Sequence, residues 1–333
     1  MPHYFVCVFI CMTNPIQFLL NKLNGLHYSQ DYLCLAKDDL VHPLHAYLVE
    51  EGRAAKDITK HHAFVGYHPL VFAFHSSVLS PRPQIELAFT EHPITNNEEI
   101  KKKDALAWLS MEMIRSMKAG VEEIYFYCGI HGSHRFTSRA GQWASELNDQ
   151  IFNRKPGNVF LEGNLFTQVR IAYSIPRKIC LITLGEKERF NEFPTDLHGT
   201  MGPEHYLVSL RHEGKAARQL MQFKTMVLSD MPASAYKKVY GLGKNHMQEP
   251  REKEAFQFSS ERSMTKGLPL PESYLGYKEL ELVDHFNWGI HGIFLFKVKY
   301  ASESNESNSL VHIHNEFASW LYKNGKPGNF LLR

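Results

Sequence analysis

Small polar and basic side chains gather between residues 191 and 246. The run Asn191-Glu192-Phe193-Pro194-Thr195-Asp196 places short polar groups beside a proline that stiffens the backbone. Ser209 and Arg211 follow near the end of an apolar run, and Lys215 opens a segment with helical spacing. The run Lys244-Asn245-His246 adds further basic groups. Helix amides and a cation together suit a dianion, so Arg211, Lys215, Lys244 and His246 are candidate phosphate ligands.

The same residues have a plainer interpretation. Residues 191–196 are also compatible with a tight turn, and Arg211, Lys215 and Lys244 with ordinary surface charges. Spacing alone favours this plainer interpretation and does not decide which basic residue reaches a phosphate. The elements that must position these side chains therefore decide the question.

The second half of the chain reads as strands with few helices. Short helices are predicted at 214–222, 233–240 and 315–323. Apolar runs predict strands at 159–161, 168–173, 179–184, 206–211, 225–229, 280–284 and 292–299. Many strands at close intervals favour a barrel or a sandwich. The polar stretches 248–266 and 302–309 are expected to be surface excursions, and the first is long enough to be a lid.

The order of these segments resembles the flavin-reductase-like family of FMN-binding split β-barrels. Members of that family begin with a proline-containing strand that has a threonine-rich edge, followed by an asparagine that opens the isoalloxazine-binding loop. Ser174-Ile175-Pro176, the strand 179–184 and Asn191 match this plan, as do the strand, helix and strand that follow up to residue 229. Far along the chain, residues 289–298 resemble the family's glycine, aspartate, histidine motif and closing strand, with Ile290 in place of the aspartate.

The resemblance implies an FMN site in this part of the chain. The loop 191–196 and Ser209 would contact the isoalloxazine, and the basic candidates would hold its phosphate. The counterpart of His291 in the family lies beside flavin and nicotinamide, so His291 would position or neutralise charge as hydride passes from NAD(P)H to flavin N5. A histidine at a strand start is more often a satisfied surface or core residue. The resemblance also implies a homodimer with the flavin near the subunit interface.

The first half carries no such resemblance. Leu106, Leu109, Met113 and Met117 fall on one stripe and predict a helix at 104–118, and a second helix is predicted at 138–152. The run 124–130 between them predicts a buried strand. Helix, strand and helix in this order indicate a layered α/β unit. Two further expectations are a hairpin of 45–49 with 54–58, and a buried strand at Tyr4 to Met12.

The expected fold class is α+β, with a C-terminal FMN-binding split β-barrel and an N-terminal α/β domain. Arg154 to Asn158 contains Lys-Pro-Gly and marks the expected boundary. The expected domains are therefore 1–155, with possible subregions 1–95 and 96–155, and 156–333.

Composition argues against several classes of protein. The net charge is +2, and Lys101 to Lys103 lie close behind Glu98 and Glu99, so no nucleic-acid surface is expected. The apolar stretch near the amino terminus is too short to cross a membrane. Five cysteines without a CxxC pair favour a reducing cytoplasm. The histidine pairs lack zinc spacing, so no metal is expected, and neither a P-loop nor GxGxxG occurs.

Three functions stay open at this point. The first is an FMN-dependent oxidoreductase that passes hydride from NAD(P)H to flavin and on to an unknown acceptor. The second is a flavin-binding or interaction protein without enzymatic activity. The third is a hydrolase or transferase whose chemistry lies in the first half, at His131, Ser133, His134 and Arg135 after the strand 124–130.

Overall fold

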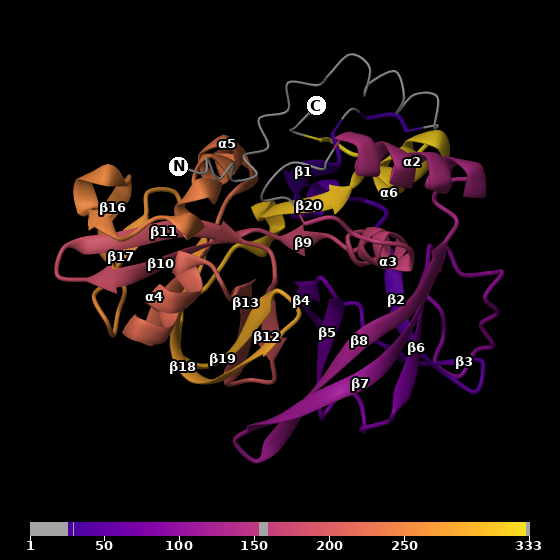
Figure 1. Cartoon of the computed structure of the whole chain (residues 1–333), viewed down its shortest axis with the longest axis horizontal. Coiled ribbons are helices and arrows are strands. Elements are labelled where there is room, and N and C mark those ends of the chain that lie inside the picture. Colours follow the sequence, from indigo (N-terminus) through magenta and orange to yellow (C-terminus); the bar gives the residue numbers. More distant parts are fainter. Residues whose placement is uncertain (1–25, 29, 153–158, 331–333) are drawn as a thin grey trace. The chain divides into compact units, whose positions relative to one another are not determined.

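The computed structural model describes residues 26–28, 30–152 and 159–330 (Figure 1). The strand expected at Tyr4 to Met12 and the boundary expected at Arg154 to Asn158 lie outside these residues. The chain divides into two compact units. Unit 1 consists mainly of Arg177–Val311, and unit 2 mainly of Asp39–Pro176 with the segment from His312 onwards.

Unit 1 is built on a curled sheet of eight strands in the order β12-β13-β19-β18-β14-β10-β11-β15 (Figure 1). All neighbouring strands are antiparallel. The strands are β10 (Cys180–Glu186), β11 (Arg189–Thr195), β12 (His198–Met201), β13 (His205–Arg211), β14 (Thr225–Asp230), β15 (Arg251–Glu252), β18 (Gly276–Trp288) and β19 (His291–Ala301).

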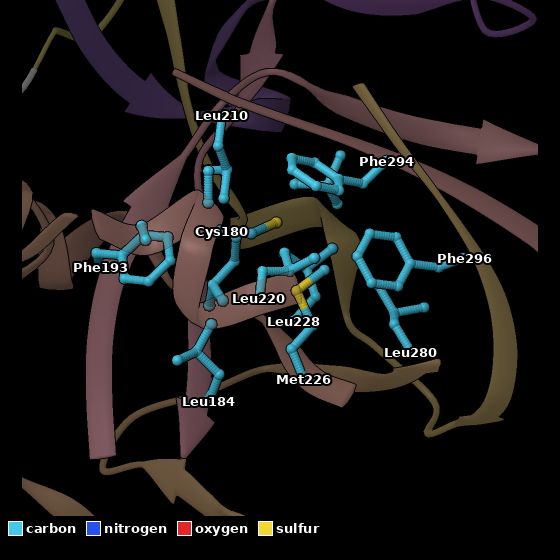
Figure 2. Close-up of a cluster of buried hydrophobic side chains, with 14 of the residues drawn as sticks. Cys180, Leu184, Phe193, Leu210, Leu220, Met226, Leu228, Leu280, Phe294 and Phe296 are labelled. Carbon is cyan, nitrogen blue, oxygen red and sulfur yellow. The ribbon is translucent and has the colours of Figure 1, made fainter. Parts of the chain in front are cut away.

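One face of this sheet packs on helix α4 (Lys215–Phe223). Side chains alternate between faces along a strand, so Cys180, Ile182 and Leu184 of β10 point to the same side. Figure 2 shows Leu220 of α4 among the side chains of these strands, with Phe294 and Phe296 of β19 beside them. Each large apolar side chain buried here contributes about 1.5–3 kcal/mol to folding.

The opposite face lies under the long connection between β14 and β18. Phe190 and Val227 from the sheet pack with Phe256, Leu268 and Leu270 from the connection. Besides β15, the elements of the connection are η2 (Ala233–Ala235), α5 (Tyr236–Gly241), η3 (Gly243–Met247), η4 (Lys253–Ala255), β16 (Phe258–Arg262) and β17 (Pro269–Pro271). The stretch 248–266, expected to be a surface excursion, therefore contributes to a cover over the sheet.

Gly185 is predicted to be essential for the β10–β11 hairpin. Its φ is +144°, and a Cβ at this position would collide with Arg189 O and lie 2.8 Å from Phe190 Cα. We expect Gly185→Ala to lower the free energy of unfolding by about 3 kcal/mol, because neither backbone atom can yield.

Urea denaturation measures this effect, with Gly241→Ala as the matched control. A Cβ on Gly241 meets no atom within 4 Å, so that change is expected to stay within about 1 kcal/mol. Equal stability of the two variants would contradict the prediction.

Unit 2 is built on seven strands in the order β3-β2-β6-β7-β8-β5-β4, again antiparallel throughout. They are β2 (His45–Glu50), β3 (Arg53–Asp57), β4 (Ala63–Tyr67), β5 (Leu70–His75), β6 (Gln84–Thr90), β7 (Ala107–Ala119) and β8 (Glu122–His134). Helix α3 (Asn164–Ala172) packs on β8, where Gly132 leaves room for Gln168 and Ile171. The remaining elements are β1 (Tyr32–Ala36), η1 (Lys37–Asp39), α2 (Arg139–Phe152), β9 (Arg177–Lys178), η5 (Glu306–Asn308), β20 (Leu310–His314) and α6 (Asn315–Lys323).

The helix predicted at 104–118 is wrong, because this segment is β7. Two register shifts, at Ser110/Met111 and Met113/Arg115, interrupt the alternation of side chains along the strand. The four-residue spacing of Leu109, Met113 and Met117 fits a helix, but it is also a multiple of the two-residue period of a strand. Without that helix, unit 2 lacks the helix, strand, helix order expected of a layered α/β domain.

Two short strand predictions are also wrong. Residues 168–173 belong largely to α3, since a short apolar run does not distinguish a buried helix from a strand. Residues 159–161 form no strand. The hairpin at 45–58, the helices at 138–152 and 315–323 and the strand at 124–130 are confirmed.

The two units share one topology. Written from the other edge, the sheet of unit 2 runs β4-β5-β8-β7-β6-β2-β3, and seven strands of unit 1 run β12-β13-β19-β18-β14-β10-β11. Matched by position in the sheet, β2, β3, β4, β5, β6, β7 and β8 correspond to β10, β11, β12, β13, β14, β18 and β19. Both sets are in chain order. Both units therefore follow the same path through seven antiparallel strands.

The likeness extends to individual residue pairs in the central hairpins. β7 and β18 each carry two register shifts, and Ser110/Met111 and Met113/Arg115 correspond to Glu279/Leu280 and Leu282/Asp284. The hairpin turns contain Gly120 and Gly289, both with positive φ. The number of residues between corresponding positions is the same along both hairpins, so these hairpins can be compared residue by residue. The pairing registers extend the comparison to the neighbouring strands.

Candidate functional site

The candidate anion site lies at the start of α4. Gly214 precedes the helix and its position has no side-chain cap, so the first-turn amides are not satisfied by a capping side chain. Arg211 ends β13, and Lys215 is the first residue of the helix. The amide of Gly214 donates to Arg211 O at 2.9 Å, which closes the turn between them. Two cationic side chains thus flank an uncapped helix N-terminus.

His246 of η3 approaches the same turn. A Cβ built on Gly214 would lie 3.9 Å from His246 O. Burial lowers the pKa of His246 most, the hydrogen bond to Gly243 O opposes this, and the Arg211 charge lowers it further. Lys215 Nζ lies 2.8 Å from Glu249 Oε1 in an exposed ion pair, and Lys244 is exposed. A bound anion would compete with Glu249 for Lys215.

Ser209 and His291 form a buried polar pair beside Arg211. Ser209 Oγ lies 3.3 Å from His291 Nδ1, and both residues are almost fully buried. Arg211 and His291 are directly opposite each other in the β13–β19 register. The fold therefore brings five of the predicted residues, Ser209, Arg211, Lys215, His246 and His291, to one end of the sheet.

The loop expected at 191–196 is wrong, because these residues belong largely to strand β11. The hairpin turn comes earlier, where Lys187 and Glu188 have positive φ. A polar run that contains a proline is typical of a turn. In the strand, however, side chains alternate between the two faces of the sheet, so Asn191, Phe193 and Thr195 are buried on one face and Glu192 on the other. Pro194 and Asp196 are partly buried.

Asn191 holds three elements of the site together. Its amide Nδ2 donates to Gln219 Oε1 of α4 at 2.8 Å and to Asn245 O of η3 at 3.0 Å. Asn245 Nδ2 returns a hydrogen bond to Glu192 O at 2.9 Å. Asn191 thereby positions the elements that carry Lys215 and His246. Gln219 was missed because it stands in no sequence motif, and Asn245 was named only within the run 244–246, without a role of its own.

A second buried group, also missed, surrounds Lys178. Lys178 Nζ lies 3.0 Å from Asp230 Oδ2 and 3.3 Å from Glu306 Oε1, and Cys180 Sγ donates to Asp230 Oδ1. Burial is the largest influence on the pKa of Asp230 and raises it, but the charges of Lys178 and Lys278 and the hydrogen bonds from Lys178 and Cys180 together lower it more, so the net shift is downward. The segments involved are distant in the sequence, so only the fold reveals this cluster.

The first-half candidates lie at the end of β8. His134 Nε2 is 3.2 Å from Glu316 Oε2, and both side chains are only 1% exposed. Burial lowers the pKa of His134 despite the opposing Glu316 charge. Arg135 Nε donates to Ala105 O, and His131 is exposed. Because His134 and Glu316 are enclosed, their pairing is that of a buried structural contact.

No protein-family model matches the chain, and no curated protein sequence does. Among solved structures, an FMN-binding protein from Thermus thermophilus is 20% identical over 38% of this chain and 71% of its own, with a TM-score of 0.33. An NADH:FAD oxidoreductase from Streptomyces globisporus is 16% identical over 45% and 88%, with a TM-score of 0.39. The styrene monooxygenase flavin reductase from Pseudomonas putida is 15% identical over 40% and 85%, with a TM-score of 0.34. Part of the chain thus resembles flavin reductases and an FMN-binding protein.

Two further observations concern the described residues alone. None of their helices is long and apolar enough to cross a membrane. Within the same part of the chain, no three His, Cys, Asp or Glu residues are grouped so that they could hold a metal ion.

Proposed function

We propose that unit 1 is a split β-barrel that binds FMN and that the chain is an oxidoreductase of the flavin-reductase-like group. Hydride would pass from NAD(P)H to the flavin and on to an acceptor that the residues do not identify. The observation that carries the proposal is the uncapped start of α4 between Arg211 and Lys215, beside the Ser209–His291 pair. The homodimer implied by the resemblance belongs to the same proposal.

The residues present fit the phosphate of FMN. The first-turn amides of α4 offer hydrogen-bond donors, and Arg211 and Lys215 add positive charge on either side of Gly214. His246 supplies a further donor when protonated. A monoester phosphate bound here would exchange the Lys215–Glu249 pair for a stronger charge-assisted contact.

His291 is the candidate for assisting hydride transfer. When Ser209 donates its hydroxyl hydrogen to Nδ1, the proton of the neutral imidazole lies on Nε2. That N–H can donate to a carbonyl or stabilise negative charge nearby. Bound FMN supplies the redox chemistry itself, so His291 needs only to position a partner and balance charge.

The cofactor is tested on purified protein. We expect a yellow protein, or one that turns yellow with added FMN, that releases FMN on denaturation. A colourless product that takes up no FMN at any ionic strength would overturn the proposal.

His291→Ala is expected to slow the reduction of bound flavin by NADH or NADPH about tenfold or more, without loss of FMN, because the Nε2 donor is removed. Stopped-flow absorbance under anaerobic conditions measures the rate. Ser209→Ala, which retains the imidazole, should slow it less. Equal rates in His291→Ala and the unaltered protein would remove His291 from the mechanism.

A flavin-binding protein without reductase activity is the second candidate. Ile290 stands where the resembled motif has an aspartate, and in the structure it offers only its carbonyl, to His212 N at 3.1 Å. A function that requires this carboxylate would be lost. Anaerobic mixing with NADH and NADPH separates the two, since an inert yellow protein supports the second candidate and bleaching supports the first.

A further inference from the structure

Three buried polar side chains share the sheet face of unit 1 that lies under the connection 231–275. Thr183 of β10 is directly opposite Glu192 of β11. Ser229 of β14 is opposite Leu181, two residues from Thr183 on the same strand face. Diagonal neighbours in a sheet are about 7–8 Å apart, so the three side chains form one group. All three are completely buried.

None of the three groups is satisfied within the described part of the chain. Thr183 Oγ1, Ser229 Oγ and both carboxylate oxygens of Glu192 have no hydrogen-bond partner there. The charge of Lys238 acts on Glu192 through space, but Lys238 Nζ contacts Gln257 O at 3.2 Å and Glu272 Oε2 at 3.5 Å. Burying a carboxyl without a hydrogen-bond partner costs free energy of folding. This cost is offset when a bound molecule supplies the missing hydrogen bonds.

Unit 2 shows that the fold does not require polar residues here. The equivalent pair to Thr183 and Glu192 is Val49 and Ala54, and Ala88 takes the place of Ser229. Val49 and Ala88 belong to an ordinary apolar cluster with Trp108, the counterpart of Tyr277. The same face is therefore packed with apolar side chains in one unit and carries three unsatisfied polar groups in the other.

We propose that Glu192, Thr183 and Ser229 form a buried site for a protonated amine, either ammonium or a primary alkylammonium group. Such a group has several N–H donors for the carboxylate and the two hydroxyl oxygens, and its charge neutralises the carboxylate. Water would supply donors but leave the carboxylate charge uncompensated. The proposal is independent of the flavin site.

Thermal unfolding of the full chain at pH 8.5 tests the site. Ammonium and methylammonium chloride are compared with tetramethylammonium chloride at equal ionic strength, because the last has no N–H donor. We expect the first two to raise Tm by a few degrees in a saturable manner. A response to ammonium alone indicates the free ion, and a stronger response to methylammonium indicates an amine ligand. Equal Tm values in all three salts would overturn the proposal and indicate a water-filled site.

The double variant Thr183→Val, Ser229→Ala introduces the residue types of unit 2. It is expected to be at least as stable as the unaltered protein in tetramethylammonium chloride, because two unsatisfied hydroxyls are removed. It should also lose most of the ammonium response and bind FMN as before. An undiminished ammonium response would overturn the site, whereas failure of both proteins to bind FMN would bear only on the proposed function.

Discussion

Replacing Arg211 by serine and Lys215 by alanine is expected to weaken FMN binding by about 100-fold or more. Each charge-assisted hydrogen bond to a phosphate contributes about 1.5–3 kcal/mol, and a tenfold change in affinity corresponds to about 1.4 kcal/mol. His75 of unit 2 is the counterpart of Ser209, so Ser77, two residues later, is the counterpart of Arg211. The change therefore gives the strand end of unit 1 the residue type already present in unit 2.

Riboflavin separates the phosphate contact from the rest of the site, since it lacks the phosphate. Fluorescence titrations should show that the double variant binds riboflavin as tightly as the unaltered protein. Lys253→Ala is the charge control, because it also removes a lysine. Lys253 Nζ lies 2.8 Å from Glu188 Oε2, in the turn between β10 and β11. Equal losses for FMN and riboflavin, or no loss for either, would contradict the assignment of Arg211 and Lys215.

Unit 2 has different chemistry at the corresponding strand ends. His75 and Glu122 occupy the positions of Ser209 and His291 and form an ion pair. A carboxylate there repels a phosphate, and no helix follows β5 before β6 begins. The shared topology therefore does not imply a second flavin site in unit 2.

Glu192→Gln is expected to change how stability depends on pH. Burial raises the pKa of Glu192 to about 7, opposed only by the Lys238 charge, while the unfolded chain has the ordinary value near 4.5. Between these values the folded state binds the proton more tightly, so stability falls as pH rises. The loss from pH 4.5 to 7 amounts to about 3 kcal/mol, since each unit of pKa corresponds to about 1.4 kcal/mol.

The glutamine variant has no carboxyl to ionise, so its stability should change less across this window. At pH 8 it is expected to exceed the unaltered protein by about 2 kcal/mol, and at pH 5 the two should be nearly equal. Urea denaturation in amine-free buffers measures both. Parallel pH profiles for the two proteins would show that Glu192 is ionised in the folded state with an ordinary pKa.

The sequence by itself determined several elements of unit 1 and where its basic groups cluster. The strands at 179–184, 206–211 and 225–229, the helix starting near Lys215 and the strand after His291 are all present. Each depends on apolar alternation or helical spacing within a few residues, which is local information. The nearness of Arg211 to Lys215 follows in the same way, because the two are separated by only a short turn.

Only the tertiary structure decided the features that depend on pairing between distant segments. Residues 107–119 form a strand because they pair with β6 and β8, whereas their four-residue apolar spacing fits a helix and a strand alike. The common topology of the two units was invisible because corresponding positions, such as Ser209 and His75, differ in residue type. Whether Glu192 is exposed in a loop or buried without a partner was settled by the cover that residues 231–275 place over its strand.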